Sequence, residues 1–210
     1  TTTTHAGAVM AHLEYLAQVQ WPELDVHMLS VSEDWAGIAV AGPNSRALLS
    51  RLFQDVNFSN DDFPFMGYRA TSADGVPARL FRLSFSGEHA YELNVPADYG
   101  LNFWTALLDI GGDLDVIPYG TEAMNILRIE KGHVTGAELN GRVTADDLGF
   151  AGMMSKQKPF VGQVLARREA LIATDRRHLV GLVPADGKSP IPSGAQIVAD
   201  PAAPTPMHCQ

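Results

Sequence analysis

The dipeptide Asp74-Gly75 lies between two segments whose side chains alternate in polarity, and this pattern constrains the fold more than any other in the chain. Asp-Gly is typical of two-residue β-hairpin turns, because both residues adopt a positive φ there. Gly42 and Gly87 are also expected at turns, and Gly87 at a positive φ, because the chain must reverse there between two strands. Strands are predicted over residues 26–31, 35–41, 68–72, 76–85 and 91–95.

Apolar residues at helical spacing predict four helices among these strands. Asn44 or Ser45 is the expected N-terminal cap of the second helix, and Thr121 that of the fourth. Trp21-Pro22 should end the first helix, because proline disfavours α geometry in the residue before it, and Gly132 should end the fourth. The predicted helices cover residues 7–20, 45–52, 97–108 and 121–131. Antiparallel hairpins combined with helices in this order are typical of an α+β fold.

The sequence changes in character after Gly132, where glycine and other small residues dominate. A short helix is predicted over residues 161–171, and β-like segments over 178–183 and 195–199. These features predict three regions. They are an α+β domain over residues 1–132, a connecting helical and loop segment over 133–175, and an incomplete C-terminal β-domain over 176–210.

Composition excludes several classes of function. Fifteen Lys and Arg against 24 Asp and Glu give a net charge of −9, which repels phosphate backbones and makes nucleic acid an unsuitable partner. The single cysteine, Cys209, excludes an internal disulfide framework, and no histidine spacing indicates a metal site. No apolar run approaches the roughly 20 residues of a membrane span, so no membrane partner is expected. We predict a cytoplasmic protein.

Four segments carry a specific resemblance. Residues 39–49 read AVAGPNSRALL, residues 84–93 read SFSGEHAYEL, residues 120–132 read GTEAMNILRIEKG, and residues 158–162 read KPFVG. In order and spacing they resemble conserved segments of the folate-binding aminomethyltransferase (glycine-cleavage T-protein) family. The runs at residues 1–4, 21–26 and 118–120 are most similar to one branch of that family, the C-terminal region of the alpha subunit of heterotetrameric sarcosine oxidases. T-proteins themselves and the related tail of dimethylglycine dehydrogenase are the alternatives.

The resemblance implies an aminomethyltransferase-like folate-binding domain whose N-terminal part precedes the chain, followed by the start of a small β-barrel. It implies tetrahydrofolate as cofactor and an oxidoreductase assembly, in which the methylene carbon of an oxidised N-methyl amine passes to tetrahydrofolate. The product is 5,10-methylenetetrahydrofolate. Flavin and NAD are expected only on other parts of the assembly, whose other subunits are the expected partners. The acid/base aspartate of the family lies upstream of the matched part. No catalytic residue is therefore assigned, and the chain alone is expected to fold, to self-associate and to bind folate weakly at best, without catalysis.

The resemblance implies folate contacts at Glu92, Phe85, Tyr91 and Arg128. A pterin presents two N–H donors side by side, and one carboxylate, that of Glu92, accepts both. Each residue also has a simpler structural interpretation: Glu92 alternates with apolar neighbours and faces solvent, Phe85 and Tyr91 belong to a core, and Arg128 pairs with a nearby helix glutamate. Phe85 stands where the family has tyrosine, so its hydroxyl contact is lost.

Two other functional classes remain open. The first is a non-catalytic folate-binding module that supports iron–sulfur cluster assembly, but residues 159–163 lack the cysteine of that signature. The second is an interdomain or subunit-contact scaffold that has lost its ligand. The scaffold differs from a folate-binding protein in whether the cleft beside Glu92 is open and polar or filled by side chains.

Overall fold

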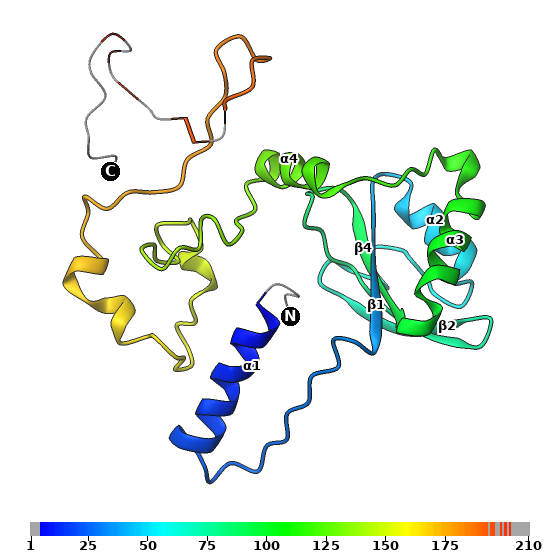
Figure 1. Cartoon of the computed structure of the whole chain (residues 1–210), viewed down its shortest axis with the longest axis horizontal. Coiled ribbons are helices and arrows are strands. Elements are labelled where there is room, and N and C mark those ends of the chain that lie inside the picture. Colours follow the sequence, from blue (N-terminus) through cyan, green and yellow to red (C-terminus); the bar gives the residue numbers. More distant parts are fainter. Residues whose placement is uncertain (1–4, 193, 196–197, 199, 201, 203–210) are drawn as a thin grey trace. The chain divides into compact units, whose positions relative to one another are not determined.

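The computed structural model describes residues 5–192, 194–195, 198, 200 and 202 (Figure 1). The chain divides into two compact units, Thr1–Val134 and Thr135–Gln210. The predicted strand at residues 195–199 lies largely outside the described residues.

A four-stranded antiparallel sheet is the centre of the first unit. Its strands are β1 (Trp35–Ala41), β2 (Tyr68–Ala73), β3 (Val76–Phe81) and β4 (Ala90–Pro96), in the order β1-β4-β3-β2. The predicted hairpin is confirmed, with Asp74 at φ 50° and Gly75 at φ 80°. Gly42 and Gly87 also have positive φ, 117° and 88°. The sheet therefore forms around the turns that the sequence predicts.

Helices α2 (Ser45–Leu52) and α3 (Gly100–Ile110) pack against each other and against the sheet (Figure 1). The core between them contains Leu48 and Leu49 of α2, Phe103 of α3, and Leu93 of β4. Helix α3 follows a single 3₁₀ turn over Ala97–Tyr99. These contacts give the mixed helix and antiparallel sheet architecture that the sequence predicts.

Two other helices match their predicted positions. Helix α1 (Ala6–Tyr15) continues as a π-helical segment over Leu16–Gln20 and ends at Trp21 as expected. Helix α4 (Thr121–Lys131) ends at Gly132, which adopts a left-handed conformation with φ 82°.

The predicted side-chain caps are wrong. The residue at the N-cap position of α4 is Gly120, so Thr121 is the first helical residue. Asn44 occupies the N-cap of α2 but donates its side-chain N–H to the carbonyl of Leu114, 3.2 Å away. Ser45 donates its hydroxyl to the carbonyl of His89 at 2.9 Å. Both side chains thus connect α2 to distant segments, a role that local sequence does not show.

Three predicted elements do not form. Residues 26–31 and 178–183 contain no strand, and the predicted helix over 161–171 is reduced to two 3₁₀ turns, Leu165–Arg167 and Glu169–Leu171. A strand needs a partner ladder, and a short helix needs an apolar face to bury. Val161 and Val164 are instead 69% and 81% exposed. The small β-barrel predicted after residue 176 has no strand among the described residues.

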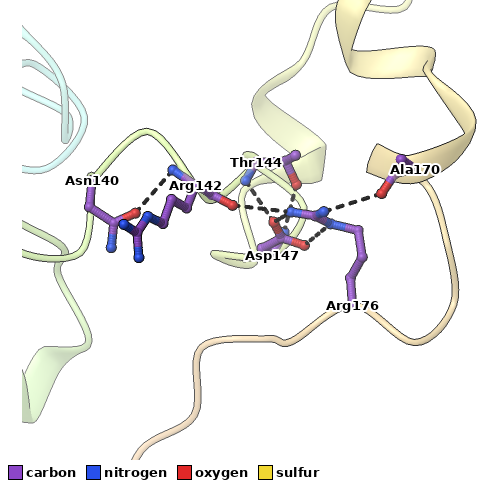
Figure 2. Close-up of polar contacts among 6 residues, drawn as sticks. All are labelled: Asn140, Arg142, Thr144, Asp147, Ala170 and Arg176. Carbon is purple, nitrogen blue, oxygen red and sulfur yellow. Dashed lines mark hydrogen bonds and ion pairs between the residues drawn. The ribbon is translucent and has the colours of Figure 1, made fainter. Parts of the chain in front are cut away.

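In the second unit, a polar cluster connects loops that are distant in sequence (Figure 2). Asp147 is 3% exposed and forms a two-armed ion pair with Arg176, whose Nε lies 2.9 Å from Asp147 Oδ1. The Thr144 amide donates to Asp147 at 2.7 Å, and Arg176 donates to the carbonyls of Ala170 and Arg142 at 3.2 and 3.4 Å. The Arg176 guanidinium is the main reason that the pKa of Asp147 lies well below its usual range.

Candidate functional site

Glu92 projects from the uncovered face of the sheet. Exposure alternates along β4, so that Tyr91, Leu93 and Val95 are buried in the core and Glu92 is exposed on the opposite side. The strand register places Ala39 of β1 and Phe81 of β3 directly beside Glu92. Its carboxylate therefore stands on a rigid strand between a small side chain and an aromatic ring.

Aromatic and cationic side chains surround Glu92 on this face. The rings of Phe81 and Tyr68 lie 5.0 Å apart between centroids, and the Arg79 guanidinium lies 3.7 Å above the ring of Trp35. Phe81 is half-buried, and it was not identified from the sequence as a site residue. The hairpin register indicates only its neighbours on β2. Its position beside Glu92 depends on the β3–β4 pairing, which follows the longer connection over residues 82–89.

Tyr91 lies on the opposite face of β4 from Glu92. It is fully buried, and its ring contacts Phe58 and Phe63, each with a centroid distance of 5.5 Å. Its hydroxyl lies 3.1 Å from Nε2 of His89. The structure therefore separates Tyr91 from Glu92, and a planar ligand on Glu92 is closer to Phe81 than to Tyr91.

Phe85 and Arg128 come together through His133. The Phe85 ring, 39% exposed, stacks on the His133 ring with a centroid distance of 5.8 Å, and His133 Nδ1 donates to the Phe85 carbonyl at 2.6 Å. Arg128 is 9% exposed and donates to the His133 carbonyl at 3.1 Å and to the Asn125 side chain at 3.5 Å. The end of α4 is thereby joined to the loop after β3. His133 carries no motif that indicates this role.

Two cavities lie in the first unit. The larger, about 570 Å³, is mostly apolar and lies beside β1, with Val40, Leu48, Trp104 and Tyr119 in its wall. The smaller, about 280 Å³, lies beside the end of α4 and includes Arg82, His89, Lys131 and His133. Glu92 lines neither cavity, because it stands on the open sheet face.

The described part of the chain offers neither a cluster of metal ligands nor a membrane-spanning helix. No group of three or more His, Cys, Asp or Glu side chains there could hold a metal ion. In that same part of the chain, no helix has the length and apolar character needed to span a bilayer.

The chain is similar in sequence to one protein family and to several known proteins. The GCVT N-terminal domain profile matches residues 1–158. The sarcosine oxidase alpha subunit of Rhizobium meliloti is 49% identical over 98% of this chain, and that of Corynebacterium sp. strain P-1 is 42% identical over 98%. The aminomethyltransferase of Streptomyces coelicolor is 33% identical over 83%. The chain spans 21% of the length of each of these two alpha subunits and 47% of that aminomethyltransferase.

Proposed function

The chain belongs to the family of the GCVT N-terminal domain, and from this premise we propose that its first unit binds tetrahydrofolate for one-carbon transfer in a sarcosine oxidase. The observation that carries the proposal is the position of Glu92. A carboxylate on a rigid strand, exposed and beside an aromatic ring, suits the planar two-donor edge of a pterin.

The residues of this chain bind and orient rather than transfer protons. The Glu92 carboxylate would accept hydrogen bonds from the two N–H groups of the pterin, and the Phe81 ring beside Glu92 would offer a face to the pterin ring. Phe85 and Arg128, joined through His133, form a second contact region for the same ligand. Tetrahydrofolate held there would supply the nitrogens that take up the methylene carbon of an oxidised N-methyl amine, which would give 5,10-methylenetetrahydrofolate and release the demethylated amine. Holding the two reactants together lowers the entropic barrier to that transfer.

The oxidation of the amine lies outside this chain in the proposal. Two of the relatives reported above are named as alpha subunits, which supports an assembly with other subunits. Flavin and NAD are proposed to bind on those other parts. Since no residue here matches an acid/base aspartate, the chain alone is proposed to lack transfer activity.

The test is calorimetry of 5-formyltetrahydrofolate with the Glu92→Gln variant. The amide replaces one acceptor oxygen with a donor, so binding should weaken by about 2 kcal/mol. Glu122→Gln, at an exposed position in the first turn of α4, is the matched control and should bind as the unchanged protein does. Equal affinity of the Glu92→Gln variant and the unchanged protein would reject Glu92 as the pterin anchor.

The scaffold hypothesis makes the opposite prediction. It expects no folate binding by the unchanged protein, and neither variant alters the result. The iron–sulfur assembly hypothesis has no support in the site, because residues 159–163 lack the cysteine on which it depends.

A further inference from the structure

The smaller cavity, about 280 Å³, gathers basic side chains from two segments of the first unit, the connection over residues 82–89 and the end of α4. Arg82 follows β3, His89 precedes β4, and Lys131 is the last residue of α4. His133 lies just beyond that helix, and Glu88 is the single acidic side chain in the cavity wall. The two segments are more than 40 residues apart in sequence, so only the fold brings them together.

The Arg82 side of this cavity is held by hydrogen bonds. Arg82 donates from its guanidinium to the Phe63 carbonyl at 2.6 Å, and its backbone amide donates to the Gly67 carbonyl at 3.0 Å. On the facing side, His133 Nδ1 donates to the Phe85 carbonyl at 2.6 Å. Because a carbonyl only accepts, the Nδ1 atom of His133 carries the proton in this hydrogen bond. Two of the basic groups therefore have set positions in the cavity wall.

Lys131 owes its place to Gly87. A Cβ built at Gly87 would lie 2.8 to 2.9 Å from Cβ, Cγ and Cδ of Lys131, which is closer than real side chains pack. The glycine therefore lets the aliphatic stem of Lys131 cross the turn toward the cavity wall. The amine remains a charged group on a stem that is packed near its base.

The net charge of the wall is positive. Arg82 and Lys131 carry two positive charges against the one negative charge of Glu88. Burial lowers the pKa of His89, and the positive charges of Arg46 and Arg82 lower it further, so His89 is not counted among the positive charges of the wall. The net positive charge of Arg82, Lys131 and Glu88 together favours an anion in the same space.

We propose that this cavity binds the carboxylate of a small organic anion through Arg82 and Lys131. Guanidinium and ammonium groups are the side chains that pair most strongly with carboxylates. The cavity wall includes Ala90, which lies two residues before Glu92 on β4, a separation of about 7 Å along a strand. Two sources fit that place: the glutamate tail of a folate, or the carboxylate of an N-methyl amino acid.

The primary test does not depend on folate. Acetate is titrated into the protein at pH 7 while NMR follows the ring signals of His89 and His133, with exposed His12 as the internal reference. We expect saturable shifts at His89 and His133 only. Lys131→Gln should raise the dissociation constant about tenfold, and Lys156→Gln, an exposed lysine of the second unit, should leave it unchanged. Shifts that do not saturate, or equal constants in both variants, would overturn the proposal.

A second set of titrations separates the two sources. Tetrahydropterin, which has no tail, 5-formyltetrahydrofolate and sarcosine are each titrated into the unchanged protein and into Lys131→Gln. A selective loss with 5-formyltetrahydrofolate assigns the site to the folate tail, and a loss with sarcosine assigns it to the amino acid. The folate titrations extend to concentrations that detect weak binding, because the chain alone is expected to bind folate weakly at best. Saturable acetate binding without any folate binding would then reject the proposed function and keep this site. Folate binding without saturable acetate binding would support the proposed function and reject this anion site.

Discussion

Each of the two units of this chain is stabilised internally by a different kind of interaction. The first buries apolar side chains between a sheet and two helices, including Leu49, Phe53, Leu80 and Leu93 at 0% exposure. Among the described residues of the second, only Asp147 and Leu148 are buried, and Asp147 is paired with Arg176. Apolar burial is non-directional and additive over many side chains, whereas the ion pair depends on the geometry and charge of a few groups. The units should therefore respond differently to the same perturbation.

The largest effect is expected from Leu93→Ala, which removes a fully buried side chain from the centre of the sheet. The lost burial and the remaining cavity should cost about 3 kcal/mol of unfolding free energy. Denaturant unfolding followed by tryptophan fluorescence measures it. Leu101→Ala on α3, where the side chain is 75% exposed, is the control and should change stability little. Similar losses in both variants would show that the apolar core does not hold this unit.

Asp147→Asn tests the second unit. The amide keeps the shape of the side chain but removes its charge, so Arg176 loses its ionic partner in a site that is 3% exposed. We expect amides near residues 142–147 and 170–179 to exchange hydrogen faster, while the amides of β4 keep their protection. Asp146→Asn, the exposed neighbour, is the matched control. Unchanged protection in Asp147→Asn would mean that the ion pair does not organise these loops.

Acid provides a graded form of the same test. Because the folded-state pKa of Asp147 lies below its usual range, the carboxyl contributes stability that is complete above its unfolded pKa. That contribution should decrease as the pH falls below about 4 and be lost below the folded pKa. The difference in exchange protection between the unchanged protein and Asp147→Asn should therefore shrink over this range. A difference in exchange protection that stays constant with pH would contradict the view that the negative charge of Asp147 stabilises these loops.

The smallest effect is expected from Gly87→Ala, which separates turn geometry from core packing in the first unit. Gly87 has φ 88°, a region that costs other residues about 1–2 kcal/mol, and the new methyl group would also displace the Lys131 stem. Thermal unfolding should show a loss smaller than that of Leu93→Ala. Gly112→Ala, where a Cβ meets no atom within 4 Å, should melt as the unchanged protein does. A Gly87→Ala variant of unchanged melting temperature would show that the turn relaxes without cost.

Local signals in the sequence predicted the first unit better than the second. Asp74-Gly75 specifies its hairpin because the turn and its strands are adjacent, and Gly132 ends α4 because only the local φ matters. The β propensity of residues 26–31 and 178–183 and the helical spacing of 161–171 were misleading, because those segments have no described neighbour that completes a ladder or covers an apolar face. Propensity is realised only where tertiary contacts support it.

By itself, the sequence determined the α+β class, the hairpin, most helix positions and the identity of Glu92 as an outward-facing strand residue, since each depends on periodicity or on a single turn. Only the tertiary structure decided which side chains lie beside Glu92. The connection over residues 82–89 leaves the β3–β4 register undetermined until the strands pair, and that register places Phe81 beside Glu92 and Tyr91 on the far face. The ion pair of Asp147 and Arg176 likewise joins residues 29 positions apart, and such non-local pairings depend on three-dimensional packing rather than on local spacing.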